Sequence, residues 1–398
     1  MKKPFLLPAI AAASLILTGG LLTSWMNSRE RNEQLHFENE ETELIVANVA
    51  NVHLHLFKAG KNLQDTTRIS ALSDDRVWLR RGNYFLRANL PSHSIFMSVP
   101  ITGYRRGPDD DGALAITVRS LPREYPPRLF SDMPEYVYIP SGYFLIGDRL
   151  NPTEPHYVRL GAFFISPFEV SNAEFREFFN DPAGYADTSN WTEAGQKWKS
   201  SYASQMTALL TPKDDRFPRF GQPDQPVTWV NWFEATAYCR WLTKKIGKGR
   251  WTFALPTEAE WEKAARGPDN FDYALSMSLS DDEVKLYNWK KNPDAPITVV
   301  GIKETPASYR PNRYGLYHLT GNVVEWTQSI FLPFNQQHPF VNEDRHRHDP
   351  DLPGQRVARG GSWYSASNAY LYIPYRDAFQ PEHCSQDVGF RIVARVVL

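Results

Sequence analysis

Cysteine is nearly absent from this chain, which has two cysteines, Cys239 and Cys384, in 398 residues. Two cysteines cannot build the dense disulfide framework of a small secreted domain. Cys239 lies in a helical pattern and is predicted to be a small core residue, whereas Cys384 lies in a polar loop. A single disulfide between them is the alternative that the sequence leaves open.

An excess of charge of one sign is also absent, because 44 Lys and Arg balance 45 Asp and Glu. The net charge of −1 gives no electrostatic reason to expect nucleic acid as a partner. The sequence also lacks a glycine-rich phosphate loop, a nucleophile elbow and a His-Glu-x-x-His helix. It therefore shows none of the common signatures of nucleotide-binding proteins, serine hydrolases or zinc peptidases.

Charged residues are missing altogether from Pro4 to Met26, directly after Lys2 and Lys3. An apolar run of about twenty residues can span a bilayer. A cleaved signal peptide is the alternative, but no convincing small-x-small cleavage site and no lipid-accepting cysteine is found near the end of the run. We therefore expect residues 1–27 to form an uncleaved membrane anchor, with the rest exported, on the periplasmic side in a Gram-negative cell.

Three segments are expected between this anchor and the second half of the chain. The charged residues 28–43 are expected to form a stalk. Residues 44–120 show short alternating runs separated by turn residues, which predicts a small all-β sandwich domain. Four prolines in residues 121–134 predict a stiff linker.

Residues 135–398 combine few helices with many turns, which predicts an α+β domain with much of its surface built from loops. Helix starts are predicted at Ser171, Asn231 and Thr257, each with a glutamate three residues later. A turn at 140–142 between two apolar segments predicts a hairpin over 136–146. Strand-like pieces are expected at residues 296–300, 357–359 and 390–397.

Six specific motifs of this second domain follow one another in the order found in a known family. They are Phe168–Phe175, Pro226–Trp232, Leu255–Gly267, Gly315–Trp326, Arg359–Trp363 and Gly389–Arg391. On these motifs the chain resembles the formylglycine-generating enzyme family, also called the sulfatase-modifying-factor or FGE-sulfatase family, from about residue 136 to the end. The resemblance implies a variant of the C-type-lectin-like fold with a groove on one face.

The resemblance has a gap at the position of the family's oxidase chemistry. The oxidase members hold Cu(I) with two cysteines shortly after the Gly-Gly-Ser-Trp run, whereas here Ser365 occupies the first position and Ala366–Tyr375 contains no sulfur. Cu(I) is a soft ion that calls for sulfur ligands, and serine hydroxyls do not replace thiolates. The chain is therefore predicted to be a divergent member that lacks the copper-binding pair, and neither copper nor formylglycine generation is expected.

The resemblance also implies a structural calcium site. Such sites recur in the family beside the Gly-Asn-Val-x-Glu-Trp motif, which makes Asn322 and Glu325 the expected ligands. His318 stands where an asparagine or aspartate is usual, and it is expected to weaken the site because calcium prefers oxygen ligands. Asn288 resembles a ligand of a second site, with a plain hydrogen-bonding asparagine as the alternative.

In the family the segment 363–376 lines the groove, and here it is rich in tyrosines, which offer rigid apolar faces with polar tips. The expected ligand-binding residues are Trp363, Tyr364, Ser365, Ser367, Asn368, Tyr370, Tyr372 and Arg376. The alternative is that some of the tyrosines cover the core and that Arg376 forms a buried ion pair.

Two functions remain open. The missing thiols favour a membrane-anchored exported protein whose groove binds a small molecule or an exported protein, as a binding or scaffolding module. The alternative is an exported tailoring enzyme of oxidoreductase type on the same scaffold. Ser365, Tyr372 and Arg376 would then carry the chemistry.

Overall fold

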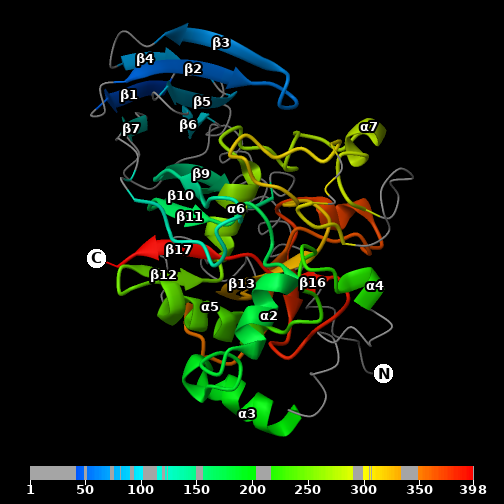
Figure 1. The fold of residues 1–398 in the computed structure, drawn as a ribbon. Coiled ribbons are helices and arrows are strands. Elements are labelled where there is room, and N and C mark those ends of the chain that lie inside the picture. The colour runs from blue at the N-terminus through cyan, green and yellow to red at the C-terminus, as the bar shows by residue number, and fades with distance from the viewer. Residues whose placement is uncertain are drawn as a thin grey trace, which may run out of the picture.

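The computed structural model describes residues 42–48, 52–71, 76–80, 82–89, 94–101, 114–118, 122, 124–148, 156–202, 217–289, 299–303, 305, 307–332 and 348–397. The predicted anchor at 1–27 and nearly all of the predicted stalk at 28–43 lie outside these residues. Within the described ranges, no helix is both long and apolar enough to cross a membrane. The described chain mixes helices and strands, with an N-terminal part made of strands alone and a longer C-terminal part (Figure 1).

The N-terminal part consists of two sheets that share one hydrophobic cluster. Its strands are β1 (Thr42–Asn48), β2 (His53–Ala59), β3 (Thr66–Ala71), β4 (Arg76–Leu79), β5 (Gly82–Asn89), β6 (Ser94–Ile101) and β7 (Leu114–Val118). They form a three-stranded sheet in the order β4-β1-β7 and a four-stranded sheet in the order β3-β2-β5-β6. Leu44 and Leu114 of the first sheet lie in one cluster with Leu56 and Leu86 of the second.

Most of these strands lie where the alternating runs predicted them, and burial alternates along β2 and along most of β6. The strand β3 was missed, since its sequence is mostly polar and shows no period of two. Two statements stay predictions. One is that the domain limits fall at 44–120 and 121–134, and the other is that residues 44–120 form an independent sandwich domain.

The three predicted helix starts in the C-terminal part are confirmed. The helices α2 (Asn172–Asn180), α5 (Trp232–Ile246) and α6 (Glu258–Arg266) each begin with a complete capping box. The inward faces of α2 and α5 join the largest aromatic cluster of the described residues, with Phe178, Trp232 and Trp241 among its members. Shorter helices are α3 (Glu193–Tyr202), α4 (Phe217–Phe220), α7 (Asp281–Val284), η1 (Thr188–Asn190) and η3 (Asn368–Leu371).

The predicted hairpin at 136–146 is wrong, because its two strands belong to different sheets. The strand β8 (Val137–Ile139) pairs with β11 (Phe163–Ile165), while β9 (Gly142–Ile146) pairs with β10 (His156–Leu160). Lys263 of α6 reaches the turn between them, where its Nζ donates to the carbonyl oxygens of Pro140 at 2.6 Å and Gly142 at 3.2 Å. The Lys263 ammonium group is thus the hydrogen-bond donor to these two turn carbonyls. The chain passes from the sheet of β8 to the sheet of β9 at this turn.

Two four-stranded sheets lie in the C-terminal part, and strands of the second overlap three of the six family motifs. One has the order β12-β17-β11-β8 and the other the order β15-β14-β13-β16. Their remaining strands are β12 (Trp251–Ala254), β13 (Val324–Ile330), β14 (Arg356–Arg359), β15 (Asp377–Phe379), β16 (Val388–Gly389) and β17 (Val393–Val396). The strand-like pieces predicted at 357–359 and 390–397 are confirmed by β14 and β17, whereas most of the piece at 296–300 lies outside the described residues.

The N-terminal strands pack directly on the C-terminal part. Arg313 joins the two, since its Nε donates to both carboxylate oxygens of Asp269 and its Nη2 donates to the carbonyl oxygen of Leu63 at 3.0 Å. The same guanidinium group lies 4.5 Å from the ring centroid of Phe85 on β5. Further along the contact, the Tyr157 hydroxyl donates to the Pro100 carbonyl oxygen at 2.9 Å.

Candidate functional site

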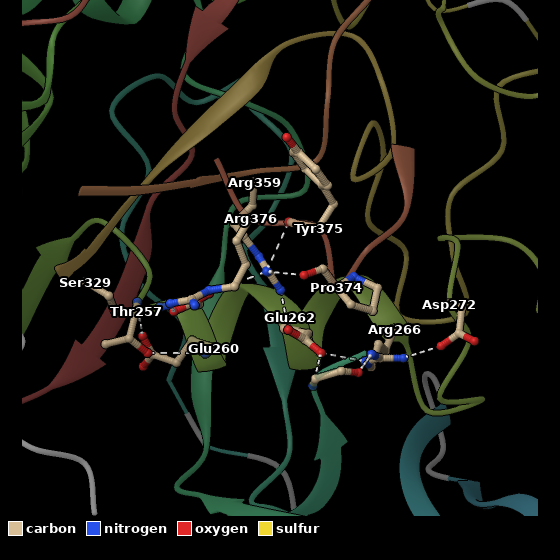
Figure 2. A network of polar contacts seen from close by, with 12 residues as sticks. Thr257, Glu260, Glu262, Arg266, Asp272, Ser329, Arg359, Pro374, Tyr375 and Arg376 are labelled. Carbon is tan, nitrogen blue, oxygen red and sulfur yellow. Dashed lines mark hydrogen bonds and ion pairs between the residues drawn. The ribbon is translucent and has the colours of Figure 1, made fainter. Parts of the chain in front are cut away.

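The segment from Arg359 to Arg376, which includes the residues 363–376 predicted to line the groove, is held at both ends by ion pairs to α6 (Figure 2). At the first end, Arg359 pairs with Glu262 and with Glu258, the latter at 3.4 Å. At the other end, Arg376 contacts both carboxylate oxygens of Glu258. The side chains of these four residues are at most 4% exposed, so the helix fixes where the segment starts and stops.

Glu262 also ties this segment to the rest of the domain. It accepts a hydrogen bond from Arg266 Nε at 2.8 Å and one from the Gly147 amide at 2.9 Å. Arg266 in turn donates to Asp272 at 2.6 Å. Because every buried charge in this chain of contacts has a partner of opposite sign, the network is stable as a whole and sensitive to the loss of any one member.

The turn that leads into the segment requires glycine. Gly360 and Gly361 have φ values of 96° and 65°, in the left-handed region. A Cβ atom on Gly361 would lie 2.5 Å from the carbonyl oxygen of Tyr370, so the backbone of the segment closes directly on this turn.

At the position of the family's first copper cysteine, the chain has a network of hydroxyl and carboxylate oxygens. Ser365 Oγ accepts a hydrogen bond from the Ser362 amide at 2.8 Å, and Ser362 Oγ donates to Asp387 at 2.6 Å. Ser385 donates to the other oxygen of Asp387 at 2.7 Å. These hard oxygen atoms can bind polar or cationic groups, but they supply no thiolate nucleophile.

The two cysteines lie in different elements, Cys239 within α5 and Cys384 between β15 and β16. Cys239 lies inside α5 in the aromatic cluster, is 2% exposed, and burial strongly raises the pKa of its thiol. Cys384 is half-buried, and burial, with the charge of Glu234 nearby, raises the pKa of its thiol as well. Both are free cysteines, so the single disulfide is not formed in this structure. Cu(I) needs a pair of thiolates, and neither thiol is poised to ionise.

The tyrosine-rich segment divides into exposed and engaged residues. Tyr364 is 55% exposed, and Asn368 is exposed, whereas Trp363 is buried against Phe220. Ser367 caps η3, and Tyr370 packs on Tyr375 with ring centroids 4.7 Å apart. The exposed face that remains for a ligand is therefore centred on Tyr364 and Asn368.

The three residues considered for an enzyme have different partners. Ser365 bonds within the serine network, Tyr372 donates to Asp148 at 2.7 Å, and Arg376 pairs with Glu258. These three side chains therefore share no hydrogen-bond partner in the contacts given above. The Arg376 guanidinium forms a buried ion pair, which was the alternative role predicted from the sequence.

A titratable acid borders the segment at Asp377, the first residue of β15. Burial raises the pKa of Asp377 to about 6, and the nearby carboxylate of Asp387 adds to the rise. Tyr375 is its hydrogen-bond partner. Sequence reasoning missed Ser385, Asp387 and Asp377, because only strand pairing brings Asp387 to Ser362 and Asp377 near Asp387.

The residues expected to bind calcium are engaged with protein groups. Both oxygens of Glu325 contact Arg391 at 2.6 Å, and one also accepts from Trp261. The Asn322 side-chain oxygen accepts from Asn288 at 3.0 Å and from the Val300 amide at 2.9 Å. A calcium ion at this motif would therefore have to draw its ligands mainly from backbone carbonyls.

His318 supports the same buried arrangement. Its Nδ1 lies 3.3 Å from Glu169, which also accepts a hydrogen bond from the Asn322 amide group at 2.9 Å. In the part of the chain that the structure describes, no three His, Cys, Asp or Glu side chains are grouped so that they could hold a metal ion.

Comparison with known proteins finds relatives of this chain whose names indicate different activities. The chain is 30% identical over 298 residues to the formylglycine-generating enzyme of Streptomyces coelicolor, covering 64% of this chain and 87% of that protein. It is 29% identical over 289 residues to the inactive Cα-formylglycine-generating enzyme 2 of Mus musculus, covering 65% and 85%. It is also 30% identical over 233 residues to the hercynine oxygenase of Mycolicibacterium thermoresistibile, covering 55% and 48%.

The family model described as the sulfatase-modifying factor enzyme 1-like domain matches residues 123–396. This range includes all six motifs, the α6 network and the segment that carries the candidate site. The chain therefore belongs to the sulfatase-modifying factor family, as one of its divergent members.

Proposed function

We propose that this chain is an exported, membrane-anchored binding or scaffolding member of the family that does not perform the copper-dependent oxidation of cysteine. The observation that carries the proposal is the Ser365–Ser362–Asp387 network, which fills the place of a thiolate ligand with oxygen atoms. A relative named as inactive is about as similar to this chain as one named as active, so the fold alone does not imply the oxidase.

The ligand of the proposed module is a peptide of an exported protein or a small molecule that docks on the exposed side of the segment. Tyr364 offers a large amphipathic surface there, next to the exposed amide of Asn368. The ends of the segment are fixed by α6, so little conformational freedom is lost on binding. A structural calcium ion at the Asn322 motif is also part of this proposal.

A direct test selects peptides from a displayed library on the full chain and then measures binding and mass of the selected peptides. We expect stoichiometric binding, an unchanged peptide mass, and loss of binding in Tyr364→Ala. Tyr125→Ala is the matched control, since Tyr125 is also an exposed tyrosine but lies outside the segment. Peptides whose mass changes on incubation with the chain would contradict the binding module.

The second candidate is an exported tailoring enzyme of oxidoreductase type. It is favoured by the similarity to a protein named as an oxygenase and by Asp377, an acid with a pKa of about 6 beside the segment. For this candidate we expect turnover of a small substrate that Asp377→Asn abolishes while the free energy of unfolding stays near that of the wild type.

A further inference from the structure

The outer face of the sheet β4-β1-β7 has an amphipathic pattern that the core does not explain. Along β4, Leu79 is buried and Val77 packs on the hydrophobic cluster, so the residues between and beside them point the other way. These outward residues are Arg76, Trp78 and Arg80, and all three are exposed. Trp78 is 60% exposed, the largest exposed fraction of any large hydrophobic residue described.

The neighbouring strand β1 contributes Glu43, Ile45 and Ala47 to this face. The register pairs Ile45 with Arg76 and Glu43 with Trp78. Leu44 and Val46 are buried, whereas Ile45 is half-buried and Ala47 is exposed. The face thus presents an aromatic ring between two guanidinium groups on β4, with Ile45 and Ala47 of β1 beside them and Glu43 at the register position of Trp78.

The charge of this part of the chain differs from that of the rest. Residues 44–120 contain ten Lys and Arg against six Asp and Glu, although the whole chain has a net charge of −1. The remainder of the chain is consequently acidic. The positive charge of residues 44–120 is complementary to an anionic surface, whereas the preceding residues 28–43 contain two Arg and six Glu.

The entry of the chain into this sheet points to the same partner. Thr42, the first residue of β1, is the register partner of Leu79, so the chain joins the sheet beside Trp78 and Arg80. Residues 28–41 connect it to the apolar run, and fourteen residues can extend to at most about 50 Å. If the apolar run spans a bilayer as proposed, this sheet is the described part of the protein that is tethered nearest to it.

We propose that the outer face of the β4-β1-β7 sheet rests on the surface of an anionic lipid bilayer. Tryptophan is enriched at the headgroup level of membranes because its ring is apolar and its N–H is polar. Arginine binds phosphate groups with its planar fork of donors, and each basic residue near an anionic surface strengthens the attraction. Figure 1 places this sheet at the opposite end of the molecule from α3. This contact would fix the orientation of the whole chain on the membrane, in addition to the tether.

The test uses the full chain with a polarity-sensitive dye at Ala47→Cys, which keeps Trp78 and both arginines in place. Cys384→Ser is introduced in the background, while Cys239 is buried. The chain is mixed with vesicles of phosphatidylglycerol and phosphatidylcholine. We expect a blue shift of the dye emission and quenching by brominated lipid, both lost in Trp78→Ala and in the double variant Arg76→Gln, Arg80→Gln.

The matched control carries the dye at Tyr364→Cys in the same background, where no shift is expected. Vesicles of phosphatidylcholine alone separate the anionic headgroup from the apolar surface, and we expect a much smaller shift with them. A dye at Ala47→Cys that reports water with both kinds of vesicle would overturn the proposal. A shift that appears without lipid and grows with protein concentration would also overturn it, and would assign the face to a second copy of the chain.

Discussion

The ends and the middle of the segment from Arg359 to Arg376 differ in burial and in the type of contact that they make. Both ends are arginines in buried ion pairs with α6, whereas the middle consists of serine hydroxyls and exposed side chains such as Tyr364. Arg359 and the glutamates of α6, which belong to the family motifs, hold the backbone in place, and no cysteine lies between Arg359 and Arg376. The comparison teaches that a scaffold and its chemistry can be separated within eighteen residues of one chain.

The largest expected effect comes from breaking the scaffold at its most buried ion pair. Arg391→Met leaves Glu325 as an unpaired charge, and both side chains are 0% exposed. We expect a loss of about 3–5 kcal/mol in the free energy of unfolding, measured by urea denaturation. The control is Lys197→Met, because the Lys197–Glu193 pair is 75% exposed on both sides and its loss should leave the urea midpoint unchanged. Equal shifts in the two variants would show that burial does not decide the effect.

The next largest effect is the loss of stability when a glycine of the turn Gly360–Gly361, which leads into the segment, is replaced. Gly361→Ala places a methyl group 2.5 Å from the Tyr370 carbonyl oxygen at a φ of 65°, so we expect a loss of about 2–3 kcal/mol in thermal or urea unfolding. Gly249→Ala has a similar φ of 69° but no neighbour within 4 Å, and should lose only about 1 kcal/mol. If both variants lose the same amount, the close approach of the segment to the turn is not what requires glycine.

The third effect is the pH dependence of the free energy of unfolding, which comes from buried carboxyl groups that lack an ion pair with arginine. Among the described residues no arginine lowers the pKa of Glu174 or Glu234, and burial raises the pKa of each from 4.5 to about 7. A raised carboxyl pKa contributes stability that is full below the unfolded value and is lost as the pH rises through the folded value. We therefore expect the free energy of unfolding to fall between about pH 4.5 and pH 7, and to fall less in Glu174→Gln. A pH profile with the same slope in the variant would contradict this assignment.

The smallest expected effect lies in the middle of the segment. Ser365→Ala removes the acceptor of the Ser362 amide hydrogen bond, and Ser365 is only half-buried, so water can replace it. We expect a loss of about 1 kcal/mol or less in urea unfolding. A loss as large as that of Arg391→Met would mean that the serine network is part of the scaffold.

Local sequence signals predicted the helix starts correctly, because a capping box is complete within four residues, as at Thr257–Glu260. The hairpin at 136–146 was predicted wrongly, because its turn is held by Lys263, more than a hundred residues away in the sequence. The serine network was missed for the same reason, since Asp387 meets Ser362 only through the pairing of β13 with β16. Sequence patterns therefore predicted local structure, while long-range contacts required the structure.

The most direct test of the central claim is a Cu(I) titration of the full chain against a competing chelator, followed by incubation with a cysteine-containing sulfatase peptide under oxygen. The account predicts no stoichiometric Cu(I) binding and a peptide cysteine of unchanged mass, because Ser365 and the oxygen network stand where thiolates would be needed. Stoichiometric copper together with conversion of the peptide cysteine to formylglycine would contradict it.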